Sequence, residues 1–231
     1  MTRVGILYGG RSGEHEVSRC SAASVYSAID RSRYDVLAIG IDYDGRWYPQ
    51  EPARIMEDRD FGKVLDIKKN GLWLVNHFEN DGRLWLYDIE SGGRRYVDLV
   101  FPVLHGTFGE DGTLQGLLEL AMGPYVGADV IGSAVGMDKD VAKRLLRDAG
   151  IRVVPWITVN RREWEGGAAS IAERAISELG LPLFVKPVNA GSSVGVRKVK
   201  ERAALGEAVE RAFDFDTRIM MEKAVDCREI E

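Results

Sequence analysis

Short apolar runs of strand length alternate with helical patterns through the first half of this chain of 231 residues. Residues 3–10, 34–42 and 97–106 are such runs, and residues 111–123 follow the third run with leucines on one side of a helix that a Gly-Pro pair ends. Alternation of strands with helices is typical of a parallel sheet, because parallel neighbours need a crossover connection. The pattern therefore predicts an open parallel α/β domain at the N-terminal end.

Residues 42–96 interrupt this alternation. Asp44-Gly45 is a hairpin turn pair, and two short apolar segments lie on either side of Asn80-Asp81-Gly82. We expect an insertion with a small sheet in this region.

The second half of the chain has a different order of elements, which predicts an α+β module with an antiparallel sheet. Its strands are expected at residues 153–159, 181–188, 196–200 and 217–225, and its helices at residues 168–180 and 201–213. Glycines cluster between residues 128 and 136, where the pattern changes. The expected domains are therefore residues 1–130 and 131–226.

Charge and composition exclude several classes of protein. The net charge is −5 and the pI is near 5.4, so a basic surface for nucleic acid is not expected. The two cysteines, Cys20 and Cys227, do not have the spacing of a metal site. The N-terminus does not match a signal peptide, and the most apolar window, residues 120–137, carries Asp129 and Pro124. We expect a cytoplasmic protein without a membrane partner.

A lysine at the end of an apolar strand precedes a loop of small residues. Lys186-Pro187 leads into residues 189–195, which read Asn-Ala-Gly-Ser-Ser-Val-Gly. An ammonium group and unhindered backbone N–H groups are what a phosphate chain binds. The order of residues is not that of a Walker A loop. The alternative is a flexible hairpin turn with a solvated lysine.

Two further polar loops follow strands of the first half. Glu14 lies in the loop after the first strand, where a carboxylate is placed to meet an ammonium or hydroxyl group. A dinucleotide fingerprint is the competing interpretation, but Tyr8 stands where its first glycine is required. An acidic first turn of a helix is the structural alternative for Glu14. His105 begins the other loop, and a purely structural histidine is equally consistent with its position.

Six segments, in order and at matching spacing, resemble the D-alanine:D-alanine ligases, a family within the ATP-grasp enzymes. The segments are GGRSGEHEVSRCSA, HGTFGEDGTLQGLLEL, PYVG, MDKDVAKRLL, LFVKPVNAGSSVGV and MEKAV. The resemblance covers nearly the whole chain. It implies an N-terminal domain of the pre-ATP-grasp type, a central ATP-grasp subdomain, and a C-terminal domain that is largely absent and of which residues 227–231 would be the start.

The family joins two D-alanine molecules at the expense of ATP, with Mg²⁺ as a cofactor. The first carboxylate takes the γ-phosphoryl group to give D-alanyl phosphate, and the amine of the second molecule attacks it to form the dipeptide for peptidoglycan synthesis. A ligase that takes D-lactate or D-serine as its second substrate is an alternative. So is a non-catalytic fragment that only binds nucleotide.

The matching motifs imply a role for each of several residues. Glu14 would bind the ammonium group of the first D-alanine, with His105 beside it, and Ser192 would help to orient the carboxyl loop. The residues expected to meet ATP are Lys139 and Lys186 at the phosphates, the backbone amides of Ser192, Ser193 and Val194 as a lid, Glu222 and Lys223 at the adenine edge, and Glu229 at the ribose.

The same resemblance implies that the magnesium ligands belong to the C-terminal part, so no metal ligand is expected among these residues. The 231-residue chain by itself is therefore expected to be inactive, since the metal ions neutralise the phosphates during transfer. A homodimer is the expected assembly.

Overall fold

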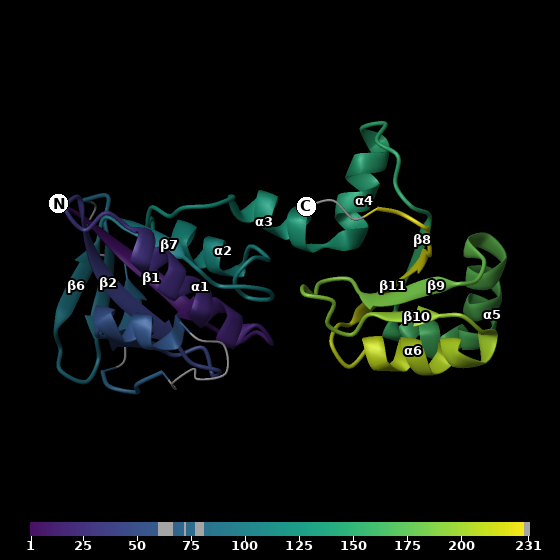
Figure 1. Cartoon of the computed structure of the whole chain (residues 1–231), viewed down its shortest axis with the longest axis horizontal. Helices are drawn as coiled ribbons and strands as arrows, with labels where there is room; N and C mark the ends of the chain where they lie inside the picture. The colour runs from purple at the N-terminus through teal and green to yellow at the C-terminus, as the bar shows by residue number, and fades with distance from the viewer. Residues whose placement is uncertain (60–66, 72, 77–80, 229–231) are drawn as a thin grey trace. The chain divides into compact units, whose positions relative to one another are not determined.

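The computed structural model describes residues 1–59, 67–71, 73–76 and 81–228. The chain forms two compact units, Met1–Ala134 and Val135–Glu231, each with its own sheet (Figure 1). The division falls within helix α3 (Val130–Met137).

One sheet runs through the first unit, in the order β6-β5-β4-β3-β2-β1-β7. Its strands are β1 (Thr2–Gly9), β2 (Tyr34–Ile41), β3 (Trp47–Gln50), β4 (Trp73–Asn76), β5 (Leu84–Asp88), β6 (Arg94–Val97) and β7 (Leu99–Pro102). β1 pairs in parallel with β2 and β7, which confirms the predicted parallel arrangement for these three strands.

The region of the predicted insertion differs from expectation. Its strands form no separate small sheet, because β3 to β6 continue the main sheet in antiparallel order. The cause is the turn after β2, where Oδ1 of Asp42 accepts from the backbone N–H groups of Asp44 and Arg46, and Gly45 has φ of 83°. The tight turn returns the chain antiparallel to β2, and the outer edge of β3 is then free for the strands that follow.

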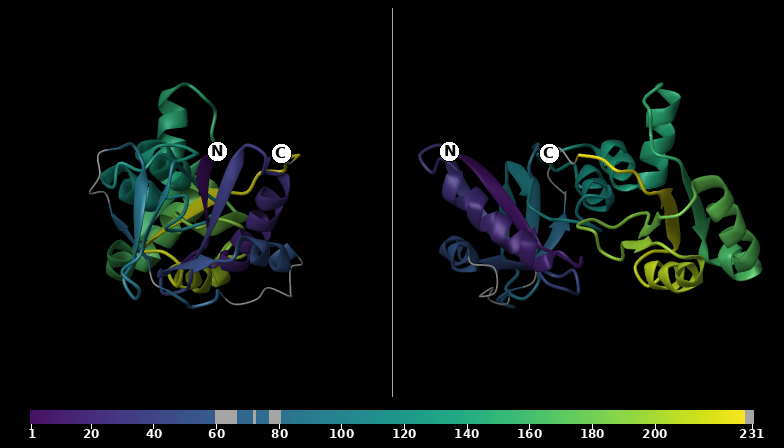
Figure 2. Two further views of the ribbon diagram at one scale, coloured as in Figure 1. Left: turned by 90° about the vertical axis from the view of Figure 1, so that its left-hand side faces the viewer. Right: turned by 45° about the vertical axis from the view of Figure 1, so that its right-hand side comes forward.

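Both faces of this sheet are covered, which explains why β1 is apolar along almost its whole length. Val4, Ile6 and Tyr8 belong to a core shared with helix α1 (His15–Ala28). Leu7 points the other way, into a core shared with helix α2 (Thr113–Leu120). Figures 1 and 2 show α1 running alongside β1. A 3-10 helix, Pro52–Arg59, packs against α1.

The second unit has a four-stranded sheet in the order β10-β9-β11-β8, and all its pairs are antiparallel, as predicted. The strands are β8 (Trp156–Asn160), β9 (Leu183–Pro187), β10 (Arg197–Val199) and β11 (Arg218–Lys223). The helices are α4 (Lys139–Asp148), α5 (Arg161–Leu179), the 3-10 turn Arg202–Ala204 and α6 (Leu205–Ala212). α5 and α6 share the main core of this unit with the sheet.

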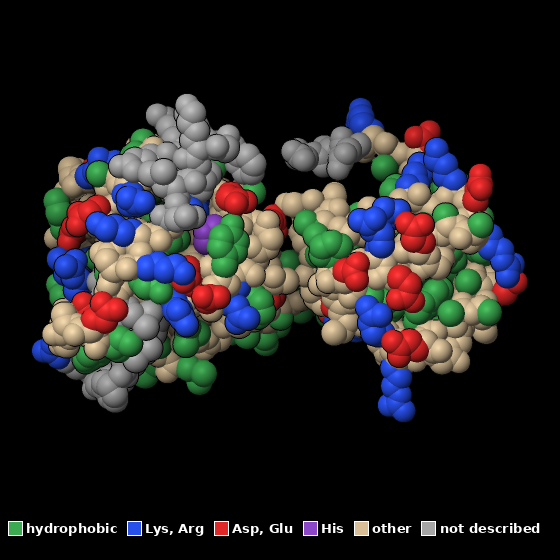
Figure 3. All heavy atoms as spheres, turned by 90° about the horizontal axis from the view of Figure 1, so that it is seen from below, with side chains coloured by type: hydrophobic (Ala, Val, Ile, Leu, Met, Phe, Trp, Pro, Cys, Tyr) green, Lys and Arg blue, Asp and Glu red, His purple; other side chains and the backbone are tan. Residues whose placement is uncertain are grey.

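The charged side chains are mixed by sign. On the face shown in Figure 3, Lys and Arg side chains are interspersed with Asp and Glu side chains over the described residues of both units. Among the residues that the structure describes, the helices are too short or too polar to cross a bilayer.

Candidate functional site

A cavity of about 720 Å³ in the second unit gathers most of the residues that the sequence assigned to ATP. Its walls come from the start of α4, from β9 and the loop after it, and from the end of β11. Six of the expected residues line it: Lys139, Lys186, Ser192, Ser193, Glu222 and Lys223. Val194 is not among the described lining residues, and Glu229 lies outside the described part of the chain.

The alternation of strand β9 places its lysine in the cavity. Leu183 and Val185 are fully buried in the core with α5 and α6, so Phe184 and Lys186 lie on the opposite face of the strand. Glu222 pairs with Phe184 in the antiparallel register of β11 and β9, which puts its side chain on the same face. Two strands distant in sequence thus present one lysine and one glutamate side by side.

The carboxylate of Glu222 accepts hydrogen bonds from two lysines. Oε1 accepts from Nζ of Lys143 and Oε2 accepts from Nζ of Lys186. Burial by itself would raise the pKa of Glu222, but the hydrogen bonds and charges of Lys143 and Lys186 outweigh it and hold this pKa below its ordinary value. The carboxylate is therefore ionised at neutral pH.

Lys139 stands at the first position of α4, after an Asp138 side chain that accepts from the N–H groups of Asp140 and Val141. Its Nζ donates to the carbonyl of Val188 at 3.1 Å and to that of Ala190 at 2.5 Å. Burial, and secondly the charge of Lys186, lower the pKa of Lys139. Through its two hydrogen bonds, Lys139 connects α4 to the segment that follows β9.

The loop after β9 has an unusual backbone. Ser192 and Ser193 have φ of 45° and 57°, in the left-handed region that residues other than glycine rarely adopt. Gly195 has φ of 69°, and a Cβ there would lie 2.7 Å from the ring of Phe215, so this position requires glycine. The amide of Val194 donates to the carbonyl of Gly191 at 3.0 Å and is thus engaged within the loop.

In the first unit, Glu14 and His105 lie at the ends of adjacent parallel strands. Glu14 stands before the first turn of α1, and its N–H donates to Oγ of Ser12 at 3.1 Å. A Cβ at Gly106, the residue after His105, would lie 2.5 Å from Oε2 of Glu14. The two polar loops are therefore in direct contact, as the strand-end argument predicts.

Two serines of α1 hold these loops, and neither was assigned a role from the sequence. The hydroxyl of Ser18 donates to the carbonyl of Val103 at 2.5 Å and accepts from the N–H of Gly9 at 2.8 Å, so it links β1 to the segment after β7. Oγ of Ser21 lies 2.9 Å from Nε2 of His105. Their spacing of three residues on one helix face is the signal that would have identified them as a pair.

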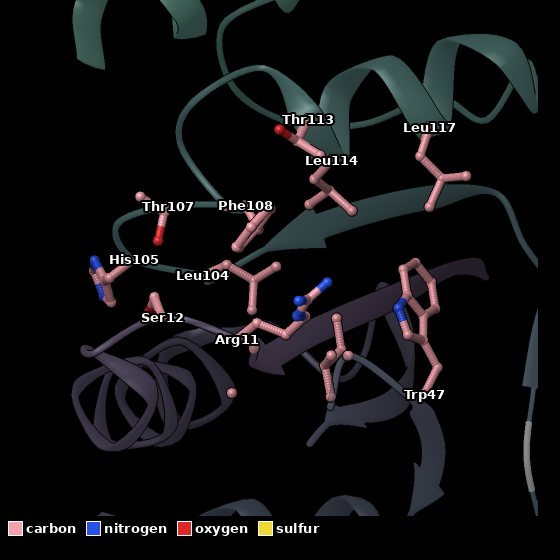
Figure 4. Close-up of a pocket in the computed structure, with 15 residues that line it drawn as sticks. Arg11, Ser12, Trp47, Leu104, His105, Thr107, Phe108, Thr113, Leu114 and Leu117 are labelled. Atoms are coloured by element: carbon pink, nitrogen blue, oxygen red, sulfur yellow. The ribbon is translucent and has the colours of Figure 1, made fainter. Parts of the chain in front are cut away.

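A second cavity, of about 350 Å³, opens beside His105 and is largely apolar (Figure 4). Leu114 and Leu117 reach into it from α2, opposite Arg11 and Trp47. The guanidinium of Arg11 lies over the ring of Phe108, 4.8 Å from its centroid. Glu14 is not among the described residues that line this cavity.

The cavity of the second unit has side chains and backbone groups that suit phosphate. Three lysines face one cavity with a serine-rich loop, which fits a chain of phosphates. Among the described residues, His, Cys, Asp and Glu side chains form no group of three or more that could hold a metal.

Comparisons with known proteins match both units. A family model described as the D-ala D-ala ligase N-terminus matches residues 3–128, and one described as the D-ala D-ala ligase C-terminus matches residues 145–231. The chain is 47% identical, over 99% of its length, to D-alanine–D-alanine ligase A of Chromobacterium violaceum, and 44% identical, again over 99%, to that of Escherichia coli. It spans 62% of the length of each of these relatives.

Solved structures give the same result. The D-alanine-D-alanine ligase from Coxiella burnetii is similar with a TM-score of 0.82 and 35% identity, over 98% of this chain and 64% of that one. The VanG D-Ala:D-Ser ligase from Enterococcus faecalis is similar with a TM-score of 0.80 and 38% identity, over 97% of this chain and 63% of that one.

Proposed function

This chain belongs to the D-alanine–D-alanine ligase family, and on that premise we propose that it supplies the ATP site and the first D-alanine site of a ligase that joins two D-alanine molecules. The cavity with Lys139, Lys186 and Glu222 is the observation that carries the proposal. The reaction is the transfer of the γ-phosphoryl group to a D-alanine carboxylate. Attack by the amine of a second D-alanine on the D-alanyl phosphate then expels phosphate and gives a dipeptide for peptidoglycan synthesis.

Lys139 and Lys186 hold the phosphates of ATP in this proposal. Their two ammonium groups face the same cavity as the serine-rich loop, and positive charge near a transferring phosphoryl group stabilises the negative charge that develops there. Entry of the phosphates gives Lys139 and Lys186 anionic partners in place of the carbonyls and the carboxylate that now accept from them.

The loop of residues 189–195 covers the γ-phosphate. The amides of Ser192 and Ser193 are expected to bind it, as is the amide of Val194 once it leaves the carbonyl of Gly191. Closure of such a loop excludes water, which protects an acyl phosphate from hydrolysis. We also propose that Ser192 helps to orient the carboxyl loop through hydrogen bonds.

In this proposal Glu222 and Lys223 contact the edge of the adenine base, and Glu229 binds the ribose hydroxyls. Glu222 is an ionised acceptor, and adenine presents an amino group as donor. This assignment accounts for a charged glutamate in a cavity otherwise suited to anions.

Glu14 binds the ammonium group of the first D-alanine, with His105 beside that substrate. Glu14 contacts the loop of His105 through Gly106, and the hydrogen bond between Nε2 of His105 and Oγ of Ser21 holds the histidine ring in one orientation. An anionic carboxylate next to a fixed imidazole is suited to an amino acid that carries both charges.

Magnesium enters only as a general requirement of the family. Among the described residues, His, Cys, Asp and Glu side chains form no group that could hold a metal, and this chain matches only 62% of the length of its relatives. We propose that the magnesium ligands correspond to the part of those relatives that this chain does not match. We accordingly propose that the 231-residue chain binds ATP and D-alanine without turnover, and that the whole protein is a cytoplasmic homodimer.

Phosphate release is the test of this function. The protein that contains this chain should release phosphate only when ATP, Mg²⁺ and D-alanine are all present, and equal release with L-alanine would contradict the substrate.

The likeness to the VanG D-Ala:D-Ser ligase favours D-serine as a second candidate for the second substrate. Analysis of the product formed from mixed D-alanine, D-serine and D-lactate, a dipeptide with either amino acid and an ester-linked depsipeptide with D-lactate, distinguishes these ligases. Turnover by the 231-residue chain alone would contradict its proposed inactivity.

A further inference from the structure

Glu222 is shared between two lysines that have different positions relative to the cavity. Lys186 and Glu222 line the cavity, whereas Lys143 is not among the described lining residues. Lys143 binds Oε1 of the carboxylate and Lys186 binds Oε2, so each lysine has an oxygen of its own. Lys143 thus binds the carboxylate of Glu222 without being among the described residues that line the cavity.

The environment of Lys143 holds it in this place. Its ammonium group lies 5.0 Å from the centroid of the Trp156 ring, a cation–π distance. The indole N–H of Trp156 donates to Oδ1 of Asp140 at 2.7 Å, and Asp140 belongs to the same helix as Lys143. The side chain of Lys143 is only 14% exposed and that of Glu222 only 15% exposed. The contact is therefore a built and largely desolvated ion pair.

We propose that Lys143 is a positioning residue for nucleotide binding, which keeps the carboxylate of Glu222 ionised and in place when Lys186 turns to a phosphate group. The proposal rests on the proposed function, because it requires ATP as the ligand. Lys143 is a residue to which the family resemblance assigned no role.

The physical reason is the charge balance around Glu222. A phosphate chain competes with Glu222 for Lys186, and each bond that Lys186 makes to phosphate weakens its bond to the carboxylate. A desolvated carboxylate without a counter-charge is unfavourable and would take up a proton or turn out to solvent. Lys143 supplies the remaining counter-charge, and each oxygen keeps a second lone pair to accept from the amino group of a base.

The inference predicts a selective effect on base recognition. ITP carries a carbonyl where ATP carries the amino group, so an ionised Glu222 favours ATP over ITP. Lys143→Met is expected to reduce the ratio of ATP to ITP affinity about tenfold, the loss typical of a charged hydrogen bond. Lys143→Arg should restore most of the ratio because it retains the charge.

Calorimetric titration of the 231-residue chain with ATP and with ITP measures both affinities. Arg147→Met is the matched control, since Arg147 lies on the same helix and over the same Trp156 ring at 5.4 Å, whereas the described lysine partners of Glu222 are Lys143 and Lys186. It should leave the ratio unchanged. Glu222→Gln should lower the ratio by itself, and adding Lys143→Met to it should cause no further loss.

The outcomes separate the inference from the proposed function. Loss of ATP and ITP affinity by the same factor in Lys143→Met, or an unchanged ratio, would overturn the positioning role. Equal affinity of the wild-type chain for ATP and ITP would overturn it as well, while leaving nucleotide binding in place. Absence of ATP binding by the wild-type chain would instead contradict the proposed function. If Lys143→Met does not fold, a low ratio in Lys143→Arg would overturn the inference.

Discussion

Oε2 of Glu14 lies so close to Gly106 that a Cβ on that glycine would stand 2.5 Å from the oxygen. Glu14 follows β1 and Gly106 follows β7, and these strands are parallel neighbours. The contact therefore joins the two loops in which we place the first D-alanine. Gly106 also has φ of 73° and donates its N–H to Oε2 of Glu110 at 2.7 Å.

Gly106→Ala is expected to displace the Glu14 carboxylate and to weaken D-alanine binding at least about tenfold, because the added methyl group occupies the space of the oxygen. Gly92→Ala is the matched control: Gly92 has φ of 71° but no atom within 4 Å of its Cβ position. Both variants should lose about 1 kcal/mol of stability through the backbone. Titration with D-alanine checks the difference, and equal binding by the two variants would contradict the placement of Glu14.

Lys186→Ala should lower the affinity for ATP by at least about tenfold, since it removes one ammonium group from the phosphates. Lys200→Ala, which removes an exposed lysine just after β10, should leave the affinity unchanged. Glu222 keeps its bond to Lys143 in the first variant, so the fold should survive. Calorimetric titration with ATP measures the effect, and an unaltered affinity in Lys186→Ala would place the phosphates elsewhere.

Binding of ATP should take up protons at alkaline pH. Burial and then Lys186 lower the pKa of Lys139 from 10.5, so its charged form is disfavoured in the folded protein, and this cost disappears as the pH rises through the folded pKa. Phosphate beside the ammonium group favours the charged form and raises the pKa again. Between the folded pKa and 10.5, binding heats in buffers of different ionisation enthalpy should therefore reveal proton uptake. The uptake should be smaller in Lys139→Met.

Asp140 should contribute strongly to the stability of the second unit. Its carboxylate accepts from Nε1 of Trp156 at 2.7 Å and from Oγ1 of Thr158 and Nε of Arg144, both at 3.0 Å. Asp140→Ala leaves the half-buried donors of Trp156 and Thr158 without this partner and should cost about 1–3 kcal/mol, whereas Asp148→Ala, at the exposed end of α4, should change stability by less than about 0.5 kcal/mol. Urea unfolding compares the two variants.

The contribution of Asp140 to the free energy of unfolding should decrease at acidic pH. Burial alone would raise the pKa of Asp140, but the hydrogen bonds from Trp156, Arg144 and Thr158 outweigh it and lower the pKa below 3.8. The contribution is thus complete above pH 3.8 and is lost as the pH falls through the folded pKa. The difference in unfolding free energy between wild type and Asp140→Ala should accordingly shrink in that acid range. A constant difference would show that the pKa of this carboxyl is not lowered.

Local sequence patterns predicted where the strands and helices lie better than they predicted which strands pair with one another. The antiparallel sheet of the second unit and the parallel pairing of β1 with β2 and β7 were both expected. The insertion was wrongly expected to have a small sheet, because the sequence of β3 contains no signal for which strand will pair with its outer edge. Strand pairing depends on backbone groups that are the same in every residue, so it is decided by the whole sheet.

The sequence by itself determined the motifs, the alternation of β9 that turns Lys186 away from the core, and the family to which the chain belongs. Only the tertiary structure decided that Lys143 binds the carboxylate of Glu222 and that Glu14 lies against Gly106. A side chain's own periodicity sets which face of its element it occupies, and the sequence contains that information. Its partner is set by packing between elements far apart in the chain, 79 residues in the case of Lys143 and Glu222, and this packing exists only in the folded protein.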